Sequence, residues 1–167
     1  MVDVTVADTA ISMMHAKYHY LFWRPVTAID PTSVEATGDG FGPVPGYSDG
    51  NPATAEQPGW RPLIVTPNHP EYPSAHASIT SAFAEVLSRF LGTQAINIDV
   101  HGFDPAGAAG NLNAIQHFTM AEDMVEQVMN ARQWGGLHYP FSVVAGKHLG
   151  RKVAIYDLGH AFKAIDE

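Results

Sequence analysis

The 167-residue sequence contains no cysteine. This excludes disulfides, thiolate metal sites and a cysteine nucleophile. Basic residues are also few, because nine Lys and Arg stand against seventeen Asp and Glu, a formal net charge of -8. Such a balance argues against a surface that binds nucleic acid or anionic lipid. With so few cations, their positions along the chain become informative.

Long apolar runs are missing as well. No stretch approaches the roughly 18 uninterrupted apolar residues of a membrane-spanning helix. The first residues include Asp3 and Asp8 in place of the basic start of a signal peptide. We therefore expect no membrane span and no signal peptide, and the compartment stays open. With 46% hydrophobic and 16% charged residues, the composition is that of one globular domain.

Apolar residues recur at helical spacing in four segments of the chain. These segments are residues 4–22, 75–91, 118–134 and 140–162. Ser74 is typical of a helix N-cap, Gly92 of a C-terminal stop and Pro140 of a first helical turn. No strand-like alternation competes with these patterns. We therefore expect an all-α fold, a bundle of about four main helices.

Two connections without helical period separate these segments. Residues 30–73 hold most of the prolines, and a loop this long in a compact domain is usually functional or disordered. Four aromatic residues within it favour a packed loop: Phe41, Tyr47, Trp60 and Tyr72. Residues 93–113 form a second connection, rich in glycine and alanine.

Arg132 lies on an apolar stripe, since it follows Val128 by four residues and Met129 by three. A buried guanidinium is costly unless an anion pairs with it. No acidic residue follows within one helical turn. Arg132 is therefore either a ligand for a bound anion or an arginine that snorkels from the helix end.

A second unusual feature is the sequence Pro73-Ser74-Ala75-His76. A capped helix start directs several backbone N–H groups and the positive end of the helix dipole toward one point, which suits an anion. His76 in that first turn could exchange a proton with the anion. The plainer interpretation is a capped helix without a ligand.

Two more pairs of residues fit the same idea. Lys17 and Arg24 bracket an aromatic run at the end of the first predicted helix, although both could snorkel. Arg132 and His138 flank a diglycine, which would let them converge from two helices onto one centre.

In this order and spacing, Lys17-x6-Arg24-Pro25, Pro73-Ser74-Ala75-His76 and Arg132-x5-His138 resemble the three-part motif of the vanadium haloperoxidase and type 2 phosphatidic acid phosphatase superfamily. The sequences KYHYLFWRPVTAI, DGNPAT, HPEYPSAH and GGLHYPFSVVAGKHLGR are similar to its soluble haloperoxidase-like branch. The resemblance covers the chain from about Asp8 to Ala154. It implies a single catalytic domain over residues 1–167 that lacks the N-terminal helices usual in this branch.

The resemblance also implies an oxyanion cradle. Lys17, Arg24 and Arg132 would bind three oxygens of vanadate, the cofactor, and phosphate can occupy the same site. The planar fork of arginine suits such binding, and lysine adds a compact charge. Ser74 and the backbone at Ala75 would complete the cradle.

Three histidines take roles by the same resemblance. His138 would bind vanadium through a ring nitrogen, or act as the nucleophile of a phosphatase. His76 would be the general acid–base, a task suited to a group that titrates near neutral pH. His69 stands where a histidine favours bromide or iodide over chloride.

The leading hypothesis is a vanadate-dependent haloperoxidase that oxidises a halide with hydrogen peroxide. The alternatives are an acid phosphatase that hydrolyses phosphate monoesters through a phosphohistidine, and a catalytically silent oxyanion-binding domain. Ala75 replaces a glycine of the motif, and Ser142 stands where the phosphatases have an aspartate that orients the histidine. A hydroxyl lacks the charge that raises imidazole basicity, so we expect a weaker nucleophile. We also expect a dimer, which would cover an exposed apolar face.

Overall fold

The computed structural model describes residues 1–30, 51, 54–101 and 115–161. Much of the long Pro/Gly-rich connection, including Phe41 and Tyr47, lies outside the described residues, as does most of the Gly/Ala-rich connection. In the described part, no helix is long and apolar enough to cross a membrane.

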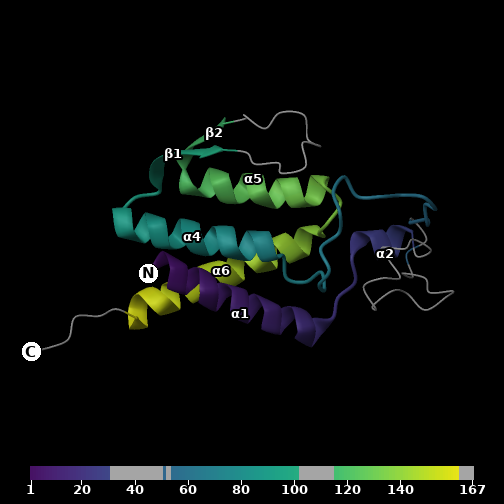
Figure 1. Cartoon of the computed structure of the whole chain (residues 1–167), viewed down its shortest axis with the longest axis horizontal. Coiled ribbons are helices and arrows are strands. Elements are labelled where there is room, and N and C mark those ends of the chain that lie inside the picture. The colour runs from purple at the N-terminus through teal and green to yellow at the C-terminus, as the bar shows by residue number, and fades with distance from the viewer. Residues whose placement is uncertain (31–50, 52–53, 102–114, 162–167) are drawn as a thin grey trace, which may run out of the picture.

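Among the described residues, four long helices and one short helix make up the framework. They are α1 (Val2–Tyr20), α2 (Pro25–Ile29), α4 (Ala75–Leu91), α5 (Ala121–Trp134) and α6 (Pro140–His160). Helix α4 is central, because it packs against α1, α5 and α6 (Figure 1). The prediction of an all-α fold with about four main helices is confirmed.

The helix ends follow local sequence signals. Helix α1 stops where Leu21 adopts a left-handed backbone, φ 48°, and Pro25 begins α2. Gly92 ends α4 with φ 70°, as predicted. Ser74 is the N-cap of α4, but its side chain makes no capping hydrogen bond. Its hydroxyl is therefore left for another partner.

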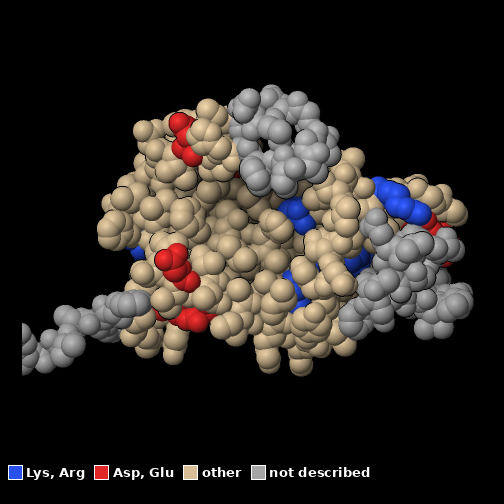
Figure 2. Space-filling model, viewed as in Figure 1, with Lys and Arg blue, Asp and Glu red and all other residues tan. Residues whose placement is uncertain are grey.

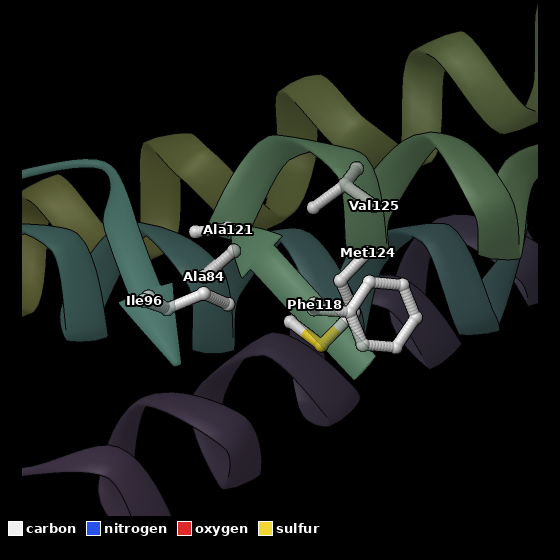
Figure 3. Close-up of a cluster of buried hydrophobic side chains, with 6 residues drawn as sticks. All are labelled: Ala84, Ile96, Phe118, Ala121, Met124 and Val125. Carbon is white, nitrogen blue, oxygen red and sulfur yellow. The ribbon is translucent and has the colours of Figure 1, made fainter. Parts of the chain in front are cut away.

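A small antiparallel hairpin corrects one detail of the prediction. Strand β1 (Ala95–His101) pairs with β2 (Ile115–Met120), and Phe118 lies opposite Ile98 in β2 instead of in the third helix. Each strand buries one side chain, Ile96 or Phe118, so the strand-like alternation is too short to be evident in the sequence. Figure 3 shows both residues in a cluster with side chains of α4 and α5: Ala84, Ala121, Met124 and Val125.

The closest packing joins α4 and α6. A Cβ atom on Gly146 would lie 2.5 Å from the carbonyl oxygen of Ser74 and 3.1 Å from Ala77 Cβ. One turn later, a Cβ atom on Gly150 would collide with the carbonyl oxygen of Ser78. These two glycines therefore fix how near α6 approaches the start of α4.

We predict that Gly150→Ala lowers the free energy of unfolding by about 1–3 kcal/mol or more, because the methyl group must push two helix backbones apart. Chemical denaturation measures this loss. Gly159→Ala on the same helix is the matched control, since its Cβ would meet nothing within 4 Å. That substitution should be neutral or stabilising by up to about 1 kcal/mol. Equal effects of the two substitutions would contradict the packing argument.

Candidate functional site

Four helix ends meet at one end of the bundle (Figure 1). These are the C-terminal ends of α1 and α5 and the N-terminal ends of α4 and α6. The residues singled out in the sequence belong to these ends or to the turns beside them. They are Lys17, Arg24, His69, Ser74, Ala75, His76, Arg132 and His138.

Lys17 is fully buried at the last turn of α1. Its Nζ donates hydrogen bonds to the carbonyl oxygens of Pro70, at 2.7 Å, and Glu71, at 2.9 Å. Burial and the nearby charge of Arg24 lower the pKa of Lys17 to about 7. The Lys17 amine is thus close to losing its proton at neutral pH. Burial and a neighbouring positive charge both disfavour the charged form of a lysine.

Arg24, in the turn before α2, is 1% exposed. Its NH1 donates to the carbonyl oxygen of Leu137 at 3.0 Å, and its NH2 donates to that of His69 at 3.0 Å. The NH2 also lies 3.1 Å from His69 Nδ1, and the NH1 lies 3.4 Å from His138 Nε2. Carbonyls and imidazoles thus hold this guanidinium and connect residues from three parts of the chain.

Arg132 and Ser74 have buried polar atoms that lack partners. Arg132 is 9% exposed and Ser74 is fully buried. Neither Arg132 Nε nor Ser74 Oγ has a hydrogen-bond partner among the described residues. Burial lowers the pKa of Arg132. A buried polar group without a partner costs about 1–3 kcal/mol, so a ligand that accepts hydrogen bonds from both groups would be favoured here.

His138 makes a short hydrogen bond that the sequence did not reveal. Its Nδ1 lies 2.6 Å from Glu71 Oε1, and the two side chains are 1% and 0% exposed. The backbone N–H of Tyr139 donates to the same oxygen at 3.1 Å. Burial raises the pKa of Glu71 to about 7 against the opposing effect of the Tyr139 N–H. Burial, followed by the charges of Arg24 and Lys17, lowers the pKa of His138.

Ser142 stands four residues after His138, but the expectation that the imidazole ring therefore lacks a carboxylate partner is wrong. Glu71, from the connection before α4, supplies a carboxylate to the ring instead. Ser142 lies near this carboxylate and lowers the pKa of Glu71. Its Oγ and Glu71 Oε2 nevertheless both lack a hydrogen-bond partner within the described part of the chain. The imidazole therefore keeps a carboxyl partner, and its basicity is raised when that carboxyl group is ionised.

His76 lies in the first turn of α4 and keeps contact with solvent. Partial burial and the charges of Arg132, Arg24 and Lys17 lower its pKa, so the three cations act on one histidine. Ala75, just before it, is helical, and its φ is not positive. The replacement of glycine at this position therefore causes no backbone strain.

His69 is half-buried beside Arg24. Burial lowers its pKa to about 4, although a hydrogen bond to the carbonyl oxygen of Pro70 acts in the opposite direction. Its Nδ1 is 3.1 Å from both Arg24 NH2 and Pro70 O. A guanidinium only donates and a carbonyl only accepts, so one tautomer satisfies one of these contacts.

The electrostatics of this end of the bundle are dominated by cations. Lys17, Arg24 and Arg132 each lower the pKa of His76 and of His138. Glu71 is the acid that faces Lys17 and His138 among the described residues. Figure 2 shows a few Lys and Arg atoms recessed among uncharged atoms on the visible face. The arrangement suits a small anion with several oxygens, placed between cations and a histidine nitrogen.

A family model described as the second helical-bundle domain of VCPO matches residues 1–167. The chain belongs to this family. A search of curated proteins gives no match. With this family model and the similarity to a solved structure described next, the resemblance to the vanadium haloperoxidase superfamily is confirmed.

Two similar solved structures are bacterial enzymes. The first bacterial vanadium-dependent iodoperoxidase is 26% identical, with a TM-score of 0.50 over 60% of this chain and 23% of its own. A holo-type bacterial vanadium-dependent chloroperoxidase is 24% identical, with a TM-score of 0.50 over 62% of this chain and 23% of its own. The chain thus spans less than a quarter of the length of either relative.

We predict that oxyanion affinity falls as the pH rises through 7. A bound dianion should raise the pKa of Lys17 above its value of about 7, so binding takes up a proton that free Lys17 loses above that pH. Molybdate stays a dianion in this range and avoids titration of the ligand. Its affinity should be about tenfold weaker at about pH 8 than at about pH 6, by calorimetry.

The Lys17→Met variant is the control for this measurement. It should bind molybdate more weakly at the lower pH, because a cation is lost, and with a smaller dependence on pH. If the unmodified protein binds molybdate equally well at the two pH values, Lys17 does not titrate in the anion site as proposed.

Proposed function

We propose that this chain forms the vanadate site of a haloperoxidase that oxidises a halide with hydrogen peroxide. Two buried donors carry the proposal, Arg132 Nε and Ser74 Oγ, because neither has a hydrogen-bond partner within the described ranges. They lie with the buried cations Lys17 and Arg24 at the same end of the bundle. The membership in a haloperoxidase family supports it. The two bacterial relatives are vanadium-dependent by their names.

The residues present fit vanadate. Lys17, Arg24, Arg132 and Ser74 would donate to its oxygens together with the backbone N–H at Ala75. His138 Nε2, on the side of the ring that faces Arg24, would bind the vanadium. Bound vanadate supplies Lewis-acid activation of the peroxide.

The remaining steps belong to side chains of the protein. His76 has contact with solvent and lies in the field of all three cations, so it would hold or release a proton at an oxygen of the anion. Partial burial and these cations lower the pKa of His76, which favours the neutral form of the ring. His69 contacts Arg24 directly, so it lies beside the proposed site, and its preference for bromide or iodide stays a prediction.

We predict that the protein, supplied with vanadate, hydrogen peroxide and bromide, brominates a phenolic dye. His138→Ala should reduce the rate by about 100-fold or more, because the vanadium ligand is lost. His148→Ala is the matched control, since His148 is an exposed histidine on α6, and it should leave the rate unchanged. A rate that is the same in the protein and in His138→Ala would refute haloperoxidase activity at this site.

The acid phosphatase stays a second candidate, and the Glu71–His138 hydrogen bond favours it. A nucleophilic histidine gains reactivity from a carboxylate that orients its ring. His138 would attack the phosphorus of a phosphate monoester, and His76 would protonate the leaving oxygen.

This candidate predicts turnover of an aryl phosphate, with competitive inhibition by vanadate and loss of activity in His138→Ala. Absence of both halide oxidation and ester hydrolysis, with phosphate still raising Tm, would leave the silent oxyanion-binding domain. All three functions would be contradicted if the protein neither oxidises halide nor hydrolyses a phosphate ester and if phosphate leaves its Tm unchanged.

Two further expectations stay predictions. One is a single catalytic domain over residues 1–167, and the other is a dimer. Exposed apolar side chains on α1 and α6 are consistent with self-association: Ile11, Tyr18, Ile155 and Tyr156. Sedimentation of the purified chain measures its oligomeric state.

A further inference from the structure

We propose that Glu71 is the positioning residue of His138. The carboxylate of Glu71 holds the imidazole ring with Nδ1–H toward itself and with the Nε2 lone pair toward the anion. The effect on anion binding rests on the proposed function, whereas the tautomer of His138 does not. Glu71 reaches His138 from a different part of the chain than Ser142, the position four residues after the histidine.

The contacts on the two ring nitrogens specify one tautomer. Arg24 NH1 lies 3.4 Å from Nε2, and a guanidinium is only a donor. At 3.4 Å this long contact favours Nε2 as the acceptor and the proton on Nδ1. The shorter contact is the stronger determinant, because Glu71 Oε1, 2.6 Å from Nδ1, accepts a hydrogen bond from Nδ1–H when the carboxyl group is ionised. The other tautomer would set Nε2–H against the guanidinium and an unprotonated Nδ1 against the carboxylate.

Glu71 is itself held rigidly by its backbone and side chain. Its N–H donates to the carbonyl oxygen of Phe22 at 2.9 Å, and its carbonyl oxygen accepts from Lys17 Nζ at 2.9 Å. The side-chain oxygen that faces the ring also accepts the N–H of Tyr139. One residue thus connects a cation of the cradle, the turn after α1 and the backbone beside His138.

An aromatic cluster includes the residues that follow Glu71 and His138 in the sequence. Tyr139 stacks on Phe141 with ring centroids 5.4 Å apart, and Phe22 meets both rings edge to face. Tyr72 lies 5.9 Å from Phe141. The side chains of His138 and Glu71 are 1% and 0% exposed, so the pair is removed from water. In a dry environment the carboxylate–imidazole hydrogen bond has its greatest orienting effect.

This arrangement has a chemical consequence for the anion. Binding through Nε2 needs a lone pair there, and a charged acceptor at Nδ1 raises the basicity of that lone pair. Without the carboxylate, a neutral imidazole can place its proton on either nitrogen. The fraction with Nε2–H would then present a hydrogen to the centre that should bind the nitrogen.

The structure offers a test by relocation of the carboxylate. Ser142 Oγ lies near the Glu71 carboxylate and has no hydrogen-bond partner within the described residues. In Glu71→Gln the charge is removed while the shape is kept. In the double variant Glu71→Gln/Ser142→Asp, a carboxylate returns to the same side of the ring from α6. Glu126→Gln, on the exposed face of α5, is the matched control for loss of one negative charge.

The first measurement is nitrogen NMR of the protein labelled with ¹⁵N-histidine, without any anion. The signals of His138, assigned with His138→Ala, should show a protonated Nδ1 and an unprotonated Nε2. Glu71→Gln should shift the ring toward a mixture of tautomers, and Glu71→Gln/Ser142→Asp should restore the original signals. The same tautomer in Glu71→Gln as in the unmodified protein would overturn the proposal.

The second measurement is vanadate binding by calorimetry. Glu71→Gln should weaken binding by about 10–100-fold, the double variant should recover much of this loss, and Glu126→Gln should have no effect. A tautomer shift in a protein that binds no vanadate would support the positioning role and refute the proposed function. Unchanged vanadate affinity in Glu71→Gln would overturn the effect of Glu71 on the anion.

Folding of the variants is checked by circular dichroism. If Glu71→Gln does not fold, Glu71→Asp takes its place, because the shorter side chain keeps the charge and withdraws the oxygen from Nδ1. It should also shift the tautomer and weaken vanadate binding. Retention of both properties in a folded Glu71→Asp would overturn the proposal.

Discussion

The structure depends on the burial of Lys17, Arg24 and Arg132 at one end of a helical bundle, where Glu71 is the carboxylate that the described residues place beside them. Lys17 and Arg24 are almost completely removed from solvent. Backbone carbonyl oxygens of residues 69–71 and of Leu137 solvate them in place of water. Dipoles of this kind reduce the cost of a buried charge but do not neutralise it. The low pKa of Lys17, about 7, reflects the part of the cost that remains.

That constraint explains why helix ends meet here. The C-terminal end of α1 carries Lys17, and the C-terminal end of α5 carries Arg132. The negative end of each helix dipole favours a cation at these positions. The N-terminal end of α4 brings free backbone N–H groups and a positive dipole, so it opposes further positive charge and favours an anion. The close approach at Gly146 holds the start of α4 against α6 and so keeps Ser74 near Ser142.

Much of this arrangement can be predicted from the sequence, because the helices have regular apolar spacing and the polar residues at their ends interrupt it. Arg132 is evident for this reason, and so is the helix start at Ser74. The hairpin is not evident, since Ile96 and Phe118 are its only buried side chains. Glu71 has no periodic signal either, because it lies in a proline-rich connection and meets a histidine 67 residues away. An acidic residue just before a predicted anion site was the available clue.

The position of Glu71 also resolves a conflict between charge and binding. A carboxylate inside an anion site would repel the anion if it faced the same space as Lys17 and Arg24. Here its Oε1 faces Nδ1 of His138 and the N–H of Tyr139, and its raised pKa shows how little compensation the pair receives from solvent. The ring of His138 lies between this carboxylate at Nδ1 and Arg24 at Nε2, so on this side the negative charge acts on the anion through increased basicity at Nε2. The site can therefore be cationic toward its ligand and still hold a carboxylate that orients its histidine.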